Sequence, residues 1–378
     1  MKSVNFLSFL IFKRGKDTNS LSYIQRLRSM YFIYPRMFQK FSNFKPEILQ
    51  LQKRYMPIIR SKFKAKGLFK SGHFSTIYSA KIRPIPKVVQ VRKRLELTDG
   101  DFVDIDWSYW TTKGVKSQKV AILLHGLEGD AQRVYMQGQT RVLNQGGWDV
   151  AGLNHRGCSG EENRMYLSYN SGRTQDLSEL IDHILSQEYY LKIALVGFSL
   201  GGNLLLKYLG EPREISHKIV AGIAISAPID LQSSLDSLMR RENIPYTLIF
   251  MRDLRNKYKR KMKLFPELMS KEKLSKIKTL LDFDNIYTAP AHGFDNAAQY
   301  YQKSSAKPFL HNIKKPVLIL NAANDSFLGP ECYPFQVAKQ HGNIYLEVPE
   351  TGGHVGFHLT NAEYYSELRV LDFLNSML

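Results

Sequence analysis

The chain has 378 residues, of which 43% are hydrophobic and 23% charged, so it carries enough apolar side chains to bury a large core. Its two cysteines, Cys158 and Cys332, exclude a disulfide framework and a zinc cluster built on thiolates, and they favour a reducing, cytoplasmic environment. The net charge of +19 is unevenly distributed and no nucleic-acid-binding motif accompanies it, which argues against nucleic acid as a partner.

The first 55 residues hold eleven Lys or Arg and only two acidic residues. Their longest apolar run, residues 4–12, contains Asn5 and Ser8 and is shorter than the ~20 residues that a membrane-spanning helix needs. In one interpretation, which we favour, translation starts at Met56. In the other, residues 1–55 form a basic, aromatic-rich arm that lies on an anionic membrane surface. Both interpretations place the main domain at residues 56–378.

From residue 88 onward, short apolar runs alternate with helical stretches, which predicts parallel β-α-β units in an α/β sandwich. A tight turn at Asp99-Gly100 joins the first two runs, so these two strands are expected to be antiparallel. The later strands need helical crossovers and are expected to be parallel. We predict eight strands, at residues 88–97, 102–109, 120–124, 148–153, 192–196, 220–225, 317–321 and 344–348.

The loop after the third predicted strand begins with His125-Gly126-Leu127, and we expect His125 to support this loop rather than to react. His125 and Asp130 also have the H-x-x-x-x-D spacing of some acyltransferases, but a helix-capping role for the aspartate is the simpler interpretation. After the fourth strand, residues 154–160 (NHRGCSG) are expected to form a pocket wall. Cys158 within them has no obvious base of its own, so we do not expect a second nucleophile there.

The fifth predicted strand runs directly into Gly197-Phe198-Ser199-Leu200-Gly201, and an apolar helix follows. This strand-turn-helix context is typical of a nucleophile elbow, in which the flanking glycines avoid clashes in a tight turn and the central serine reacts. Ser199 is therefore the predicted nucleophile. A tetrahedral intermediate needs two backbone N–H donors, one after the nucleophile and one from the loop after the third strand. We expect Leu200 and Leu127 to supply them.

Residues 228–315, between the sixth and seventh predicted strands, are basic, amphipathic and poor in β-branched runs, which predicts a helical cap. An insertion at this point lies at the ligand-binding edge of a parallel sheet. We therefore expect it to cover Ser199, exclude water and shape the substrate pocket. A basic run inside the cap, residues 252–263, is expected to form a solvated or membrane-facing surface.

A serine nucleophile needs a histidine base, and the histidine needs a carboxylate that fixes its tautomer. In this architecture the three residues follow one another in the order Ser, Asp or Glu, His, each in a loop just after a strand. Asp325 follows the seventh predicted strand and His354 follows the eighth, with Gly352 and Gly353 permitting a tight loop. Ser199, Asp325 and His354 are the predicted catalytic residues.

Other residues compete for these roles. His358 lies four residues beyond His354 but lacks the preceding glycines, and Asp284 and Asp295 lie in the cap, where neither follows a strand. A structural or surface role is the better expectation for the remaining histidines outside the loops discussed, His73, His183, His217, His292, His311 and His341.

Together these motifs resemble the YheT-like branch of the α/β-hydrolase superfamily. The resemblance rests on residues 72–78 (GHFSTIY), 99–107 (DGDFVDIDW), 123–129 (LLHGLEG), 154–160, 197–203 (GFSLGGN), 321–327 (NAANDSF) and 352–357 (GGHVGF). It covers roughly residue 56 to the end. This branch includes bacterial esterases and eukaryotic acylglycerol lipases, phospholipases and ethanol acyltransferases. Ser326 stands where the family often has Pro, a departure expected to loosen the loop of the acid.

The resemblance implies an α/β-hydrolase fold, an eight-stranded, mostly parallel sheet flanked by helices, with the helical cap between strands six and seven. It also implies hydrolysis of short- to medium-chain carboxylic esters or monoacylglycerols through an acyl-enzyme, with no metal or organic cofactor. The alternatives are acyl transfer to an alcohol by the same three residues and a non-catalytic binding module. The expected partner is a small-molecule ester or lipid, and an anionic membrane surface is a further candidate; the sequence does not indicate an oligomeric state.

Overall fold

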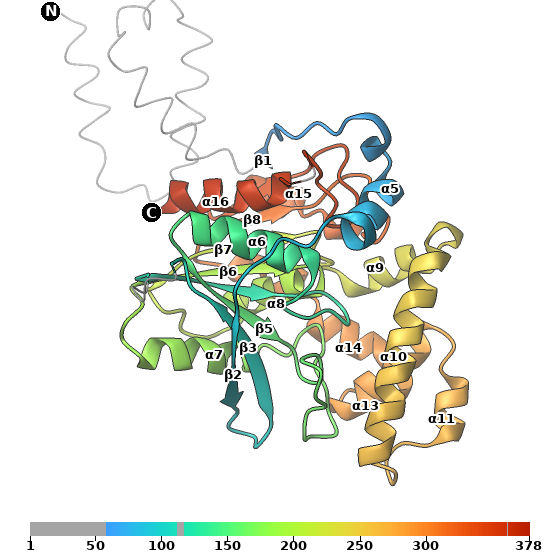
Figure 1. Cartoon of the computed structure of the whole chain (residues 1–378). Helices are drawn as coiled ribbons and strands as arrows, with labels where there is room; N and C mark the ends of the chain where they lie inside the picture. Colours follow the sequence, from blue (N-terminus) through green and yellow to red (C-terminus); the bar gives the residue numbers. More distant parts are fainter. Residues whose placement is uncertain (1–57, 112–116, 361) are drawn as a thin grey trace, which may run out of the picture. The chain divides into compact units, whose positions relative to one another are not determined.

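A nine-stranded sheet is the centre of the computed structural model, which describes residues 58–111, 117–360 and 362–378 (Figure 1). The interpretations of residues 1–55, including the start at Met56 and the membrane-surface arm, lie outside these ranges. The strands are β1 (Ile58–Ile59), β2 (Val91–Glu96), β3 (Phe102–Ser108), β4 (Lys119–Leu124), β5 (Asp149–Asn154), β6 (Lys192–Phe198), β7 (Ile219–Ile225), β8 (Val317–Leu320) and β9 (Ile344–Glu347).

The strand order is β1-β9-β8-β7-β6-β4-β5-β3-β2. As predicted, β2 and β3 are antiparallel, β4 to β9 are mutually parallel, and all eight predicted strands are present. The strand β3 also pairs antiparallel with β5. The ninth strand, β1, was not predicted because only two residues of it pair with β9, which is too short for an alternating pattern.

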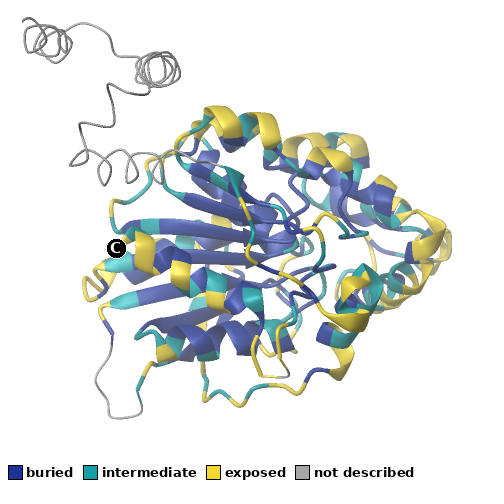
Figure 2. Ribbon diagram, turned by 90° about the horizontal axis from the view of Figure 1, so that it is seen from above, coloured by how far each residue is buried: buried dark blue, intermediate teal, exposed yellow. Residues whose placement is uncertain are grey.

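Successive residues of the central strands point to opposite faces of the sheet, and both faces are buried (Figure 2). In β6, Ile193 and Leu195 join the core under the helices α7 (Gln175–Ser186) and α8 (Leu200–Gly210). Ala194 and Val196 join the core under α6 (Val134–Gln145) and α16 (Tyr365–Met377). This three-layer arrangement explains the nearly continuous apolar runs of the parallel strands.

The segment between β7 and β8 is helical, as predicted, and forms a cap beside the sheet (Figure 1). It has an apolar core of its own, which includes Leu254, Tyr258 and Phe283. Its helices are α9 (Leu231–Leu238), α10 (Ile244–Leu264), α11 (Lys271–Lys276), α12 (Leu280–Phe283), α13 (Ala289–Ala291) and α14 (Ala297–Ser304), with short turns η4 (Arg241–Asn243), η5 (Asp284–Thr288) and η6 (Lys307–Asn312).

Five short helical segments of the described residues lie outside the cap. Three of them precede β2, and they are η2 (Gly67–Lys70), α5 (Gly72–Ile77) and η3 (Tyr78–Ile82). The short turn η7 (Pro330–Cys332) and the helix α15 (Phe335–Gln340) connect β8 with β9. Within the described ranges, none of the helices combines the length and the apolar character needed to cross a bilayer.

The basic run at residues 252–263 corrects one prediction, because two of its lysines are buried. Lys257 and Lys261 lie on the same face of α10 as the buried Leu254 and Tyr258, since residues three and four apart share a helix face. The ammonium group of Lys261 donates to the main-chain oxygens of Asn163 (2.9 Å) and Met165 (2.6 Å). Part of the positive charge therefore holds the cap to the body of the molecule instead of facing solvent.

Candidate active site

Ser199 occupies the sharp turn between β6 and α8. Its φ of 52° and ψ of −120° lie outside the regions that residues with a side chain normally adopt. The turn also depends on its glycines. A Cβ at Gly197 would lie 2.2 Å from the main-chain oxygen of Gly201, and one at Gly201 would lie 2.4 Å from that of Leu124. The local sequence therefore folds into the strained elbow that was predicted, with Ser199 at its tip.

The loop after β4 runs beside this elbow. A Cβ at Gly126 would lie 3.2 Å from the Cβ of Ser199, so a larger residue would crowd the serine. Leu127 and Leu200 both line the pocket that contains Ser199. Among the described residues, the main-chain N–H groups of Leu127 and Leu200 have no hydrogen-bond acceptor. Two free N–H donors thus lie beside one hydroxyl group.

Asp325 and His354 are brought together from the loops after β8 and β9. His354 Nδ1 lies 2.8 Å from Asp325 Oδ2, and the carboxylate is fully buried. The N–H of Phe327 donates to the other carboxylate oxygen (3.0 Å), and the phenyl ring of Phe327 stacks on the imidazole with centroids 4.3 Å apart. An ionised carboxylate can only accept, so Nδ1 carries the proton and Nε2 is available as a base.

The loop that carries His354 is held by close main-chain packing. The N–H of His354 donates to Thr76 Oγ1 (2.8 Å), and a Cβ at Gly353 would lie 2.2 Å from the main-chain oxygen of Gly72. Gly353 adopts a φ of 59°, in the left-handed region. The helix α5, which lies far away in the sequence, therefore fixes the position of the imidazole.

One pocket contains Ser199, Leu127, Leu200 and His354, and the cap supplies most of its remaining wall. Seven apolar residues of the cap helices α9, α10 and α12 contribute to this wall. These residues are Leu231, Leu235, Leu238, Phe250, Leu254, Leu280 and Phe283. The buried carboxylate of Asp325 lies behind His354 and is not part of the lining. The structure thus gathers the predicted residues at the edge of the sheet where the cap covers it.

The competing residues lie elsewhere or have other partners. His358 stacks on Phe69, with ring centroids 3.7 Å apart, in an aromatic cluster outside the pocket. Asp295 is exposed and its main-chain N–H bonds to Gln299. Asp284 does line the pocket, but its carboxylate accepts from the hydroxyl group of Tyr301 (2.7 Å) and not from His354.

His125 is fully buried under the loop after β4, as expected for a supporting residue. Its Nε2 accepts from the N–H of His155 (3.1 Å), and its Nδ1 lies 2.7 Å from the main-chain oxygen of Gly126. Burial lowers the pKa of His125 well below its ordinary value, so the ring is neutral. Asp130 bonds to the N–H of Gln132 instead, so the H-x-x-x-x-D spacing does not produce a His–Asp pair.

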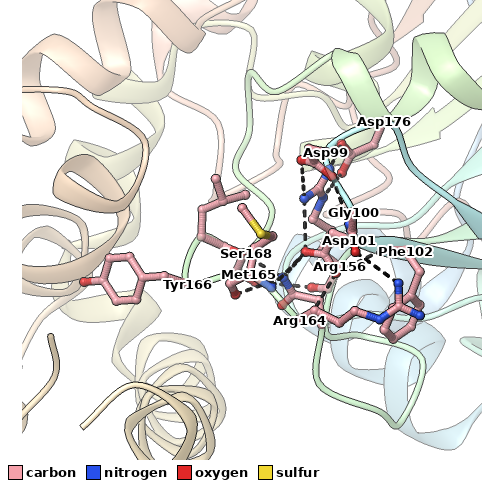
Figure 3. A network of polar contacts seen from close by, with 12 residues as sticks. Asp99, Gly100, Asp101, Phe102, Arg156, Arg164, Met165, Tyr166, Ser168 and Asp176 are labelled. Carbon is pink, nitrogen blue, oxygen red and sulfur yellow. Dashed lines mark hydrogen bonds and ion pairs between the residues drawn. The ribbon is translucent and has the colours of Figure 1, made fainter. Parts of the chain in front are cut away.

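The segment 154–160 anchors the pocket and does not line it, which corrects the prediction of a pocket wall. Arg156 is not a lining residue and is fully buried among Asp99, Asp101 and Asp176, at 2.8, 3.0 and 2.8 Å (Figure 3). The guanidinium group can satisfy several carboxylates at once, which makes its burial tolerable. The main-chain oxygen of Arg156 accepts from Ser168 Oγ (3.2 Å), and residues 168–171 form the actual wall.

An ion pair that the sequence did not indicate connects the cap with the loop of Leu127. The ammonium group of Lys257 lies 2.7 Å from Glu128 Oε1, and both side chains are buried. Tyr169 donates its hydroxyl group to the same carboxylate (2.7 Å) and accepts from the N–H of Glu128 (2.8 Å). Glu128 has a φ of 49°, so these contacts hold a strained residue directly after Leu127.

Cys158 lies beside this ion pair, with its sulfur 3.3 Å from Lys257 Nζ. Burial raises the pKa of the thiol to about 12, although the neighbouring ammonium group acts in the opposite direction. The thiol is therefore protonated near neutral pH. This agrees with the expectation that Cys158 is not a second nucleophile.

Ser326 does not loosen the loop of Asp325. Its hydroxyl group donates to Asn243 Oδ1 (2.7 Å), and its main-chain oxygen accepts from Asn243 Nδ2 (2.7 Å). Asn243 is buried and belongs to the cap. The serine side chain thus adds one hydrogen bond between the cap and the acid loop, beside a main-chain bond that does not depend on the side chain.

Comparison with known proteins identifies related sequences over most of the described part. Residues 120–359 match the family described as alpha/beta hydrolase fold. The chain is 32% identical over 321 residues to the candidate esterase YheT of Escherichia coli, a match that covers 82% of this chain and 92% of YheT. It is 29% identical over 279 residues to phospholipase ABHD3 of Mus musculus, covering 71% and 67%. With a monoacylglycerol lipase of Saccharomyces cerevisiae it shares 29% over 252 residues, covering 64% and 55%.

Solved structures share the fold at lower sequence identity. An esterase of Pyrococcus furiosus superposes with a TM-score of 0.50 at 18% identity, covering 85% of this chain and 98% of the esterase. An acylaminoacyl peptidase of Pyrococcus horikoshii superposes with a TM-score of 0.51 at 16% identity, covering 78% and 42%. At these identities the likeness concerns the architecture of the sheet and its helices.

Proposed function

Because this chain belongs to the alpha/beta hydrolase fold family and is a hydrolase of the esterase and lipase type, we propose that it is a serine carboxylesterase. The proposed substrates are short- to medium-chain carboxylic esters or monoacylglycerols. One observation carries the proposal. Ser199 on its strained elbow lines the same pocket as His354, whose imidazole is paired with the buried carboxylate of Asp325.

In the proposed acylation step, Ser199 Oγ attacks the carbonyl carbon of the ester while His354 Nε2 takes the hydroxyl proton. The negative charge that develops on the carbonyl oxygen is stabilised by the free N–H groups of Leu127 and Leu200. Asp325 stabilises the imidazolium. The bond from the carbonyl carbon to the alkoxy oxygen then breaks, and His354 gives its proton to the departing alcohol, which leaves the acyl group on Ser199.

In the proposed deacylation step, water enters where the alcohol left, and His354 Nε2 takes one of its protons during attack on the acyl-enzyme. The second tetrahedral intermediate collapses, the proton returns to Ser199 Oγ, and the carboxylic acid is released. An alcohol in place of water would give acyl transfer by the same steps. Analysis of the products in added ethanol distinguishes the two acceptors.

The size of the pocket supports short substrates. Its cavity volume is about 140 Å³, and an engineered cavity of about 150 Å³ is large enough to hold benzene. The apolar side chains of α9, α10 and α12 offer an acyl chain a dry surface. We therefore expect the best p-nitrophenyl ester to have a short or medium acyl chain rather than palmitate.

The test compares wild type, Ser199→Ala and Ser186→Ala on p-nitrophenyl esters from acetate to palmitate. The loss of the nucleophile should lower kcat by about 10⁴-fold or more. Ser186 is exposed at the end of α7 and serves as the control, which should keep wild-type activity. A fluorophosphonate probe should label wild type and Ser186→Ala and leave Ser199→Ala unlabelled. Equal activity or labelling in Ser199→Ala would contradict the proposal.

A further inference from the structure

The helix α10 presents one long face to solvent, and the two ends of this face differ in character. Residues four or seven apart in a helix point in nearly the same direction. Five exposed residues lie along this face for that reason, namely Ile244, Leu248, Arg252, Lys259 and Lys263. We call it the outer face of α10. Its first two turns are apolar and its later turns are cationic.

The apolar end of the outer face is large for a surface in contact with water. Leu248 is 65% exposed, Ile244 48% and the adjacent Ile249 37%. Met239, which lies just before the helix, is 48% exposed. One exposed leucine is ordinary in a folded protein, but several large apolar side chains within residues 239–249 indicate a surface that another molecule covers.

The helix α5 adds to this apolar end. His73 Nδ1 lies 3.0 Å from the hydroxyl oxygen of Tyr246, so α5 touches the first turns of α10. Ile77 follows His73 by one helical turn and is 46% exposed. The exposed apolar side chains therefore come from two elements that are far apart in the sequence and touch at this point.

The other end of the outer face carries positive charge that the protein does not neutralise. Residues 239–263 contain nine Lys or Arg but only two acidic residues. One of these acids, Asp253, already pairs with Arg252 (2.9 Å). Within the described ranges, four exposed cations of this stretch have no carboxylate at ion-pair distance, and they are Arg240, Arg241, Lys259 and Lys263. They flank the apolar end on both sides along the chain.

An anionic bilayer is the partner that matches both ends. A helix at a membrane surface buries apolar side chains below the head groups, while Lys and Arg stay at the lipid phosphates and are attracted to them. A second copy of this chain would bring like charges together, and a nucleic acid would leave the apolar end in water. We propose that the outer face of α10 binds an anionic phospholipid bilayer, with Ile244 and Leu248 inserted and Lys259 and Lys263 at the phosphates.

The same turns of α10 reach the pocket on their inner side. Phe250 lines the pocket, and the ring of Tyr246 packs on Phe327, another lining residue, with centroids 4.8 Å apart. A helix with its side chains is about 10–12 Å across, so docking brings the pocket to within about one helix diameter of the lipid. Docking needs no reaction, and it therefore goes beyond the proposed function and is tested without measuring hydrolysis.

The first test reports the environment of position 248 directly. Burial raises the pKa of both native thiols, Cys158 and Cys332, to about 12, so a thiol-reactive dye labels Leu248→Cys selectively near pH 7. With the full-length chain, the emission of a polarity-sensitive dye should move to shorter wavelength on vesicles of equal parts phosphatidylglycerol and phosphatidylcholine. It should not move on phosphatidylcholine alone. Both lipids are ether-linked, so that the proposed reaction cannot cleave them.

Leu191→Cys is the matched control for this label. Leu191 is also exposed, at 51%, but it directly precedes β6 and therefore lies at the edge of the sheet opposite the cap. A dye at this position should keep its emission on both kinds of vesicle.

The second test measures binding by sedimentation of the unlabelled, full-length protein with the same vesicles. Ile244→Ser combined with Leu248→Ser should lower the partition coefficient at least about 10-fold, because the inserted apolar area is lost. Lys259→Gln combined with Lys263→Gln should lower it by about 10- to 30-fold. Lys339→Gln, which changes an exposed lysine of α15, should bind like wild type.

The other outcomes overturn the proposal and can be told apart. Sedimentation of wild type without an emission change at position 248 would show that another surface, such as the basic first 55 residues, binds the bilayer. An emission change that needs no vesicles and grows with protein concentration would show that a second copy covers the apolar end. A response to double-stranded DNA but not to vesicles would assign the cations to nucleic acid. None of these readouts depends on whether the esterase proposal holds.

Discussion

The sheet and the cap fix their functional side chains in different ways. Ser199, Asp325 and His354 all lie in loops just after the carboxyl ends of β6, β8 and β9, where main-chain pairing and close glycine contacts set their positions. The cap residues depend on side-chain contacts instead, such as the ion pair of Lys257 with Glu128. The difference teaches that the proposed reactive groups are positioned by the sheet, whereas most of the pocket wall comes from one inserted segment.

The largest effect is expected from replacing His354, the histidine that the sheet positions. His354→Gln should lower kcat by about 10⁴-fold on every ester, because no other base can take the proton of Ser199. His358→Gln is the matched control, since this histidine stacks on Phe69 outside the pocket. It should keep kcat within about threefold, as measured on p-nitrophenyl butyrate. A variant pair with the opposite ranking would show that the base has been assigned to the wrong loop.

A second substitution removes the ion pair that connects the cap with the loop after β4. Lys257→Met should leave Glu128 buried without its partner and lower the free energy of unfolding by about 3 kcal/mol, as measured by urea denaturation. Because Glu128 follows Leu127, kcat should also fall, by about 10- to 100-fold, while KM changes little.

Two variants separate the ion pair from a general effect of a missing charge. Lys259→Met removes an exposed lysine of the same helix and should change neither the stability nor kcat. Lys257→Met combined with Glu128→Gln should recover most of the lost stability, because no unpaired charge remains in the protein interior. If the double variant were as unstable as the single one, the ion pair would not be the reason for the loss.

The smallest expected effect is a pH dependence of stability that comes from Asp284 in the cap. The pKa of Asp284 is raised to about 6 in the folded chain, so folding favours its protonated form. The free energy of unfolding of wild type, relative to Asp284→Asn, should therefore fall by about 2 kcal/mol as the pH rises from 4 to 7. Urea denaturation at several pH values measures it. The exposed Asp295→Asn should show no such trend, and a flat difference for Asp284→Asn as well would contradict the burial of this carboxyl.

The parts of the fold that repeat a local pattern could be predicted. The eight predicted runs became eight strands. Those at the centre of the sheet are apolar along most of their length because they are buried on both faces, whereas β2 at the edge is mostly exposed. The elbow was recognisable from its glycines, and the structure shows why they are needed: at positions 197 and 201 only glycine fits against the neighbouring main chain. Asp325 and His354 could be proposed since each directly follows a strand, and the structure places them 2.8 Å apart. The roles of these residues stay predictions until activity is measured.

The remaining features depend on contacts between distant segments. Arg156 was expected in a pocket wall because it follows β5. In the structure its guanidinium group is buried in ion pairs with three carboxylates that lie far from it in the sequence. Lys257 belonged to a basic run that resembled a solvated surface, and only the packing of α10 shows that it is buried. Asp284 was set aside because it does not follow a strand, which is a valid argument against a partner for His354 but says nothing about binding substrate.

The point at which the cap is inserted has a consequence for how such enzymes diversify. The strands β7 and β8 are neighbours in the sheet, and the whole cap is the loop that joins them. The entropy of closing a flexible loop grows only logarithmically with its length, so doubling it costs about 0.6 kcal/mol. A lineage can therefore lengthen, shorten or exchange this segment and acquire new substrates while the strand pairing that holds the proposed catalytic residues stays intact.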